Sequence, residues 1–240
     1  MIGHILVRPL CKEATMAGNR RPAGRPRTRI LNREVITGAA RRIIANDGVP
    51  ALTMTRLAHK LSVTPSALYN HATSKQEILR WIEDAVMGEI DCSAFGTTDW
   101  RTALKAWALS YRDVMAAHSE LIAAIATIEV TDSPRTVAMY ESVTKGLVDG
   151  GWPIRSCLPL IIALESFIYG AAFNEHAPDD IFDAGSLADE APTFVATVEA
   201  QRGRDLRAIN DELFEIGFDA IVDHTAKRVG VPNPAAAATA

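Results

Sequence analysis

The chain contains little of what defines several classes of protein. Its 240 residues include only three cysteines, Cys11, Cys92 and Cys157, which lie far apart and form no Cys-x-x-Cys pair. This spacing argues against a disulfide framework and against a zinc site. Aromatic residues make up 6% and charged residues 22% of the chain. These values are ordinary for a soluble globular protein and exclude disordered, fibrous and collagen-like classes.

Long uninterrupted apolar runs are also missing. The most apolar stretch, Ser156 to Phe173, contains Pro159 and Glu165. A carboxylate near the middle of a membrane span is rare, so a buried helix is the better interpretation and no membrane partner is expected. The first fifteen residues lack the apolar core and cleavage site of a secretory signal. We therefore expect a cytoplasmic protein.

The sequence lacks the common catalytic motifs. There is no Gly-rich phosphate loop, no His-Glu-x-x-His and no Gly-x-Ser-x-Gly. His176 with Asp179 and Asp180 has metal-binding residue types, but a Pro-containing acidic loop is the more economical interpretation of that segment. We expect no enzyme, no cofactor and no bound metal, with a helical enzyme kept as the lesser alternative.

What the sequence does contain is a strong charge asymmetry. Residues 1–80 hold fourteen Lys or Arg against four Asp or Glu, whereas residues 81–240 hold eleven against twenty-five. Clustered Lys and Arg supply the sequence-independent affinity for nucleic acid, although charge alone also fits a solvated basic tail. Within the basic part, Gly24-Arg25-Pro26-Arg27 resembles the arms that insert into a narrow minor groove. The alternative is a leader that raises only non-specific affinity.

Hydrophobic periodicity predicts an all-α protein, because no segment alternates with period two for long. We expect four parts: a disordered basic arm over 1–30, a three-helix helix-turn-helix domain over 31–79, a ligand-binding and dimerisation domain over 80–230, and a flexible tail over 231–240. The third helix is expected to end near His71, and the next, capped by Ser74, near Asp91.

The second and third helices form the pattern that carries function. Thr64 is a cap and Pro65 the first residue of a short helix, after a connection of only three residues. Such a short second helix fits the major groove in a helix-turn-helix unit. Leu68 and Ala67 can face inward, which leaves the polar residues for DNA; Asn70 has the amide that reads adenine.

These residues resemble the DNA-binding domain of the tetracycline-repressor (TetR) family. The resemblance runs from Asn32 through Gly48, then over Leu52 to Leu61, Val63 to His71 and Lys75 to Leu79, and it includes the element Leu-Tyr-x-His. It implies a transcriptional regulator, most simply a repressor, that binds double-stranded DNA. The expected DNA-binding residues are Arg25, Arg27, Thr55, Arg56, Thr64, Pro65, Ser66, Ala67, Tyr69, Asn70, His71 and Lys75.

The second domain resembles, more loosely, the ligand-binding core of the tetracycline-repressor branch. The similar segments are Trp100-Arg101, Tyr111-Arg112, Met139 to Glu141, Gly150 to Trp152 and Phe167 to Ala171. Where that branch carries a magnesium-binding His, this chain has apolar residues around Ile125, and near the carboxylate ligand it has Asn174. We therefore do not expect tetracycline–magnesium as the effector.

The expected pocket is largely apolar or aromatic, as ligand sites are, although an aromatic stripe at helical spacing is often plain core. Its candidate residues are Trp107, Tyr111, Met115, Ile125, Tyr140, Glu165 and Phe173. A carboxylate such as Glu165 is costly in an apolar helix unless paired. Three alternatives stay open for it: an Arg across a dimer interface, a cationic ligand, or a solvated groove.

A homodimer is expected because one short recognition helix reads only a few base pairs, whereas a two-fold dimer reads a palindrome. The apolar helix over 154–176 and the last helix, over about 205–229, are the expected interface.

The competing function is a non-specific architectural DNA-binding protein, which would need positive charge over its whole surface. The acidic remainder of this chain favours a sequence-specific regulator.

Overall fold

The computed structural model describes residues 31–178 and 180–234. Arg25, Arg27 and the expected arm over 1–30 lie outside these residues, as does most of the expected tail. Every regular element in the described ranges is helical, which confirms the all-α prediction. The α-helices are α1 (Arg33–Asp47), α2 (Met54–Leu61), α3 (Pro65–Tyr69), α4 (Lys75–Met87), α5 (Trp100–Ala117), α6 (Ile122–Ile125), α7 (Pro134–Asp149), α8 (Ile154–Asn174), α9 (Pro192–Glu199) and α10 (Leu206–Val229). The 3₁₀ turns are η1 (Val49–Ala51), η2 (Ser119–Leu121) and η3 (Gly185–Glu190).

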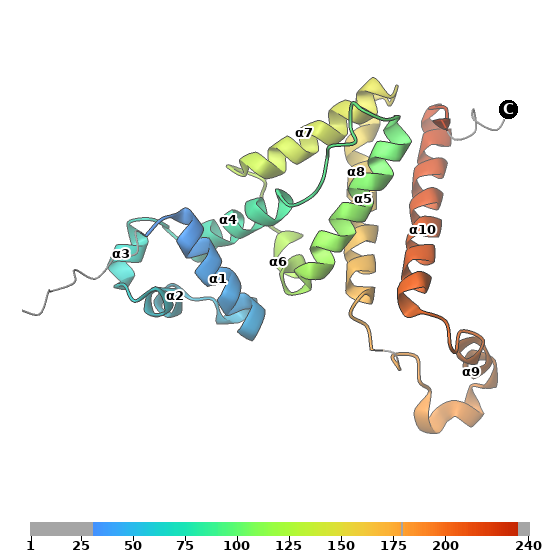
Figure 1. Cartoon of the computed structure of the whole chain (residues 1–240), viewed down its shortest axis with the longest axis horizontal. Coiled ribbons are helices and arrows are strands. Elements are labelled where there is room, and N and C mark those ends of the chain that lie inside the picture. Colours follow the sequence, from blue (N-terminus) through green and yellow to red (C-terminus); the bar gives the residue numbers. More distant parts are fainter. Residues whose placement is uncertain (1–30, 179, 235–240) are drawn as a thin grey trace, which may run out of the picture. The chain divides into compact units, whose positions relative to one another are not determined.

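The first three helices, which with their caps we call the head (residues 32–74), pack around a small apolar centre. α1 contacts α2 and η1, and α2 contacts α3 (Figure 1). Ile36, Leu57 and Leu68 contribute one apolar side chain from each helix, and each is fully buried. Short helices are only marginally stable in isolation, so the helices of the head depend for their stability on the apolar side that each one buries.

Two helix ends differ from the prediction. α3 ends at Tyr69 rather than near His71, because the amides of His71 and Ala72 both donate to the Leu68 carbonyl and turn the chain. α4 ends at Met87 rather than near Asp91, with Gly88 as its C-cap. Ile90 is buried nonetheless, and this contribution to the core explains why its periodicity suggested a longer helix.

The remaining helices from α5 to α10, which we call the body (residues 99–229), surround α8. α8 packs against α5, α7 and α10, and Figure 1 shows α8 and α10 running side by side. By length and composition α8 is the one helix among the described residues that could cross a membrane. Its buried residues, among them Leu160, Leu164 and Ile168, pack into the core of the body instead.

α4 connects the head to the body. It contacts α1 on one side and α7 on the other. Asp84 of α4 is 4% exposed and accepts hydrogen bonds from the backbone amides of Arg135 (2.7 Å) and Thr136 (3.3 Å), at the start of α7. Its other oxygen accepts from Arg33 of α1 at 3.2 Å. One carboxylate therefore bonds to both neighbours of α4.

Candidate DNA interface and effector pocket

The turn between α2 and α3 is fixed by local hydrogen bonds. Thr53 caps α2 by accepting from the Arg56 amide at 3.1 Å, and Thr64 caps α3 by accepting from the Ala67 amide at 3.2 Å. Between them Ser62 adopts the left-handed conformation (φ 57°), which lets the chain reverse within three residues. Cap residues of this kind stabilise a helix start by about 1 kcal/mol each. The geometry is that of a helix-turn-helix unit.

α3 presents polar side chains outward because its inner side is anchored by Leu68. Tyr69 is 50% exposed although it is a large aromatic residue. An exposed aromatic ring with a hydroxyl, next to an amide and an imidazole, is suited to contact phosphates and base edges. Of the residues expected to bind DNA, those that are exposed are Thr55, Arg56, Thr64, Pro65, Ser66, Tyr69, Asn70 and His71.

Two of the expected phosphate-binding residues already have partners in the head. The Lys75 ammonium donates to the Val49 carbonyl of η1 at 2.8 Å, and Lys75 is only partly exposed. Arg56 forms an exposed ion pair with Asp47. Lys75 thus links the start of α4 to η1, the turn that follows α1. Ala67, also in the expected set, is half-buried.

Inside the body, a cluster of aromatic and carboxylate side chains lies between α5, α7 and α8. Tyr111 donates from its hydroxyl to Glu165 Oε1 at 3.2 Å, and Tyr140 donates to the same oxygen at 2.6 Å. The hydroxyls of Tyr111 and Tyr169 are 2.9 Å apart, with their rings edge to face. Trp107 extends the aromatic wall by an edge-to-face contact with Tyr111 at 5.5 Å. We call Tyr111, Tyr140, Glu165 and Tyr169 the tyrosine–carboxylate cluster.

Within its own chain, Glu165 has partners that the sequence did not predict. Its partners are two tyrosine hydroxyls of its own chain. Tyr169 was missed from the sequence, although its position four residues after Glu165 on one helix was a usable signal. Phe173 is placed outside the cluster and is 51% exposed. Two steps of four residues turn a helix by about 80°, so Phe173 no longer shares the face of Glu165.

The other expected pocket residues lie in the core. Trp107, Tyr111 and Met115 are fully buried on α5, and Ile125 on α6 is 6% exposed. Tyr140 and Glu165 are partly buried. The structure thus brings Tyr111, Tyr140 and Glu165 into direct contact.

Burial changes the titration of the cluster. It raises the pKa of Glu165 above its ordinary value, against the opposing effect of the two tyrosine hydroxyls. It also raises the pKa of Tyr169 to about 12 and that of Tyr111 well above the usual range. The tyrosines are therefore neutral donors at physiological pH, and the carboxylate is the one group of the cluster that titrates in acid.

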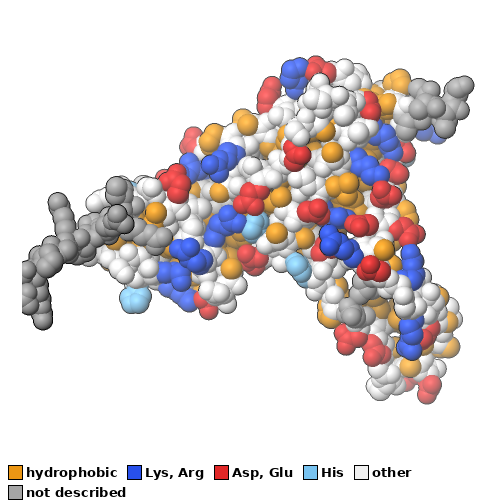
Figure 2. Space-filling model, in the orientation of Figure 1, with side chains coloured by type: hydrophobic (Ala, Val, Ile, Leu, Met, Phe, Trp, Pro, Cys, Tyr) orange, Lys and Arg blue, Asp and Glu red, His pale blue; other side chains and the backbone are white. Residues whose placement is uncertain are grey.

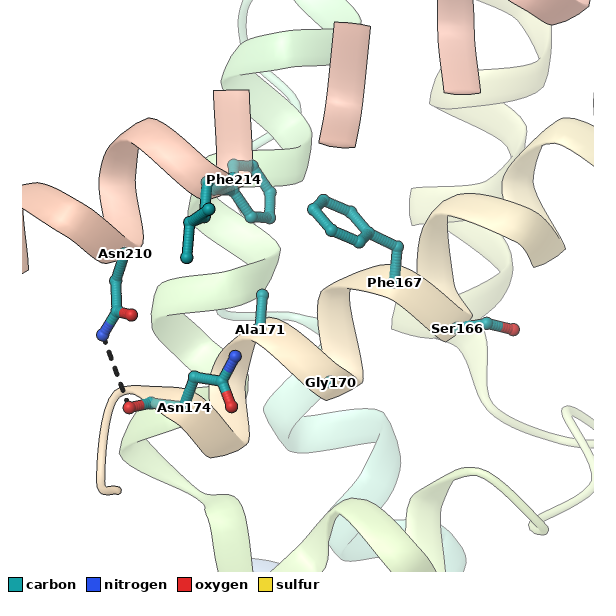
Figure 3. Close-up of a pocket in the computed structure, with 8 residues that line it drawn as sticks. Ser166, Phe167, Gly170, Ala171, Asn174, Asn210 and Phe214 are labelled. Carbon is teal, nitrogen blue, oxygen red and sulfur yellow. Dashed lines mark hydrogen bonds between the residues drawn. The ribbon is translucent and has the colours of Figure 1, made fainter. Parts of the chain in front are cut away.

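Figure 3 shows a separate pocket between α8 and α10 that sequence reasoning did not find. It has a volume of about 400 Å³, and Phe167 and Phe214 stack in it with ring centroids 5.1 Å apart. At its end Asn210 donates to the Asn174 carbonyl at 3.4 Å. Its lining residues are Ser166, Phe167, Gly170, Ala171, Asn174, Asn210, Leu213 and Phe214. Because both helices expose apolar side chains nearby, this pocket belongs to an uncovered helix face.

Comparisons with known proteins agree with this geometry. The family described as "Bacterial regulatory proteins, tetR family" matches residues 36–82, and "Tetracyclin repressor-like, C-terminal domain" matches residues 94–223. An HTH-type transcriptional regulator of Saccharopolyspora erythraea is 28% identical over 186 residues, covering 77% of this chain and 75% of the relative. The class A tetracycline repressor of Escherichia coli is 28% identical and is covered to 92%, against 82% of this chain.

Solved structures share the fold. A TetR regulator of Streptomyces coelicolor superposes with a TM-score of 0.62 at 28% identity, covering 83% of this chain and 99% of that one. ActR of the same organism, in complex with actinorhodin, gives a TM-score of 0.67 at 24% identity, covering 84% and 98%.

The titration of Glu165 gives a testable prediction. Because the pKa of Glu165 is raised in the folded state, the native protein binds this proton more tightly than the unfolded chain does. The resulting destabilisation is absent below the unfolded pKa and appears as pH rises through the folded pKa. Glu165→Gln should therefore raise Tm at about pH 7.5 by a few degrees, since 1 kcal/mol corresponds to roughly 2–4 °C at this size.

The measurement is thermal unfolding of both proteins from about pH 7.5 down to about pH 4.5. The advantage of the variant should shrink as the wild-type carboxyl becomes protonated. Glu141→Gln, at an exposed position beside Tyr140, is the control and should show no such trend. An advantage of equal size at every pH would contradict the assignment.

Proposed function

Because the chain belongs to the TetR family of bacterial regulatory proteins and is a DNA-binding transcriptional regulator rather than an enzyme, we propose that it is a repressor released by a small molecule. It acts as a homodimer in the cytoplasm on a palindromic operator. The observation that carries the proposal is α3: a helix anchored by buried Leu68 and started by Thr64, with a half-exposed Tyr69.

In this proposal the head binds DNA through α3 and the residues around it. Asn70 reads a base edge, whereas Tyr69, His71 and Thr55 contact phosphates and set the register. Arg25 and Arg27 contribute from the basic arm, which lies outside the described residues. Arg56, Thr64, Pro65, Ser66 and Ala67 complete the interface. Lys75 reaches a phosphate only if it leaves the Val49 carbonyl.

The exposed face of α8 and α10 supports the homodimer. Ile154, Leu158 and Ile162 recur every four residues along α8 and are 76%, 60% and 52% exposed. On α10, Leu213 and Ile216 are 52% and 58% exposed. A stripe of large apolar side chains on two adjacent helices typically marks an interface. A second copy of the chain, related by two-fold symmetry, would cover both stripes and place two α3 helices on one duplex.

The charge of the body argues against the architectural alternative. Residues 81–240 hold twenty-five Asp or Glu against eleven Lys or Arg. Figure 2 shows acidic side chains spread over the visible face of the body. A protein that binds DNA without sequence preference relies on phosphate contacts over a broad basic surface. Here repulsion from the body restricts DNA to the head.

The tyrosine–carboxylate cluster, with the aromatic wall of Trp107, is the proposed effector site. An apolar site with a few fixed polar groups is typical of small-molecule binding. ActR has been solved with actinorhodin, and a TetR protein of Acinetobacter baumannii with minocycline. Apolar Ile125 and the amide of Asn174 speak against a tetracycline–magnesium complex here. To release the operator, the effector only has to bind the DNA-incompetent conformation more tightly than the DNA-binding one. An affinity difference of about a hundredfold corresponds to roughly 2.7 kcal/mol.

The test of this function is binding of the full chain to a randomised duplex pool at physiological salt, followed by sequencing of the bound fraction. The proposal predicts enrichment of a palindrome with two half-sites. Uniform binding that falls steeply with salt would leave only phosphate contacts and would favour the architectural alternative.

Two variants, tested on the enriched duplex, distinguish residues that recognise bases from residues that contact phosphates. Asn70→Ala should relax base preference at one position of each half-site, by about 1–3 kcal/mol of discrimination. Tyr69→Ala should weaken binding for all duplexes alike, because phosphate contacts carry no sequence information. Gln201→Ala, at an exposed position of the body, is the control. An unaltered preference in Asn70→Ala would remove Asn70 from the readout.

A further inference from the structure

A second buried carboxylate lies beside the tyrosine–carboxylate cluster. Glu83 of α4 is 3% exposed, and its Oε1 accepts from the Thr136 hydroxyl at 3.0 Å. Its Oε2 is buried as well. Burial raises the pKa of Glu83, while the hydroxyls of Thr136 and Ser133, as hydrogen-bond donors to it, lower the pKa. Glu83 therefore has only neutral hydroxyl donors, and a buried charge without a counter-charge costs free energy that a bound cation would recover.

Glu83 and Glu165 belong to the same site. Thr136, which bonds Glu83, lies one helical turn before Tyr140, which bonds Glu165, so both contacts fall on one face of α7. Burial is the main cause that raises the pKa of Glu83, Tyr140 and Tyr169; the charge of Glu165 adds to the shift of Glu83, and the charge of Glu83 adds to those of the two tyrosines. Two carboxylates from α4 and α8 thus border one set of tyrosines.

Neither carboxylate has a cationic partner among the described residues. Arg80 of α4 and Arg135 of α7 form no ion pair with either carboxylate in the part of the chain that the structure describes. Arg33 pairs with Asp84, and Arg112, next to Tyr111 on α5, pairs with Asp113 and Asp211. The site therefore has one buried and one partly buried acidic group, and neither is ion-paired among the described residues.

Glu165 has unused hydrogen-bonding capacity, and aromatic rings lie around it. Tyr111 and Tyr140 both donate to Oε1 of Glu165, so its Oε2 is open to another donor or charge. Trp107, Tyr111 and Tyr169 contribute ring surfaces, and aromatic faces attract cations by roughly 0.5–2 kcal/mol. Anionic ligands would meet two like charges, and neutral ones would leave both carboxylates uncompensated.

We propose that the tyrosine–carboxylate cluster and Glu83 bind an organic nitrogen cation on an aromatic or apolar body, with its charge between Glu83 and Glu165. This inference rests on the proposed function, since it takes the cluster as the effector site. It also gives the effector a route to the head. Glu83 lies on α4, one residue from Asp84, so a cation that draws Glu83 inward acts on the helix that contacts α1.

The experiment uses three aromatic probes of nearly the same shape, titrated into the full-length protein by calorimetry at about pH 7.5. They are the cation 1-methyl-4-phenylpyridinium, its neutral isostere 4-methylbiphenyl and the anion 4-phenylbenzoate. The cation should bind at least roughly tenfold more tightly than either other probe, as expected for a charge-assisted contact. No binding of the cation, or equal binding of all three, would overturn the proposal.

Variants that remove one carboxylate charge test which residues recognise the cation. Glu83→Gln and Glu165→Gln should each lower cation affinity by roughly tenfold or more and leave binding of the neutral probe unchanged. Glu141→Gln removes the same charge from the exposed side of α7 and should change nothing. Circular dichroism confirms that each variant is folded. Retained cation preference in both pocket variants would overturn the proposal.

The outcome is separable from that of the proposed function. Enrichment of a palindrome is measured without any probe, so its absence would count against the repressor and leave the cation preference standing. Conversely, a protein that enriches a palindrome but prefers the neutral probe would keep its function and lose this ligand class.

Discussion

One carboxylate holds the head and the body against the same helix. Asp84 accepts from two amides at the start of α7 with one oxygen and from Arg33 of α1 with the other. Carboxylates are stabilised at helix N-termini, where free amides and the helix dipole both favour negative charge. Because Asp84 is buried, these bonds are also costly to leave unmade. The position of α4 is therefore set by groups on both sides of it.

The tyrosine–carboxylate cluster differs from Asp84, because its polar groups use only part of their hydrogen-bonding capacity. Tyr111, Tyr140 and Tyr169 satisfy one oxygen of Glu165 and one another. Glu83, one residue from Asp84, has only the neutral hydroxyls of Thr136 and Ser133 as donors. Partly satisfied networks in a low-dielectric interior cost more than an apolar core would. Such a cost is typical of binding sites, where the ligand supplies what the apo protein lacks.

Local signals in the sequence predicted much of the head. Thr53, Thr64 and Ser74 are caps that act within three residues, so they can be recognised without knowledge of the fold. The all-α class also followed from periodicity. Lys75 was harder to predict, because its partner, the Val49 carbonyl, lies 26 residues away and only the folded head brings them together.

The tyrosine–carboxylate cluster was predictable only in part. Periodicity identifies a buried face, and it placed Tyr111, Tyr140 and Glu165 correctly in the body's interior. It does not say which helices meet, so the contacts of Tyr169 and Glu83 were missed, and Phe173 proved to be half-exposed and outside the cluster. The pair Glu83-Asp84 reads as an exposed charged turn of α4 until α1 and α7 are seen to pack on either side of it.

Native-state amide hydrogen exchange of Asp84→Asn tests most directly whether α4 ties the head to the body. The account predicts faster exchange in both α1 and the first turn of α7, with α10 unchanged, because the charge that bonds both neighbours is lost. Glu141→Gln, which removes an exposed charge from α7, should leave all three helices as in the wild type. Faster exchange confined to α7 or to α1 alone would contradict the account.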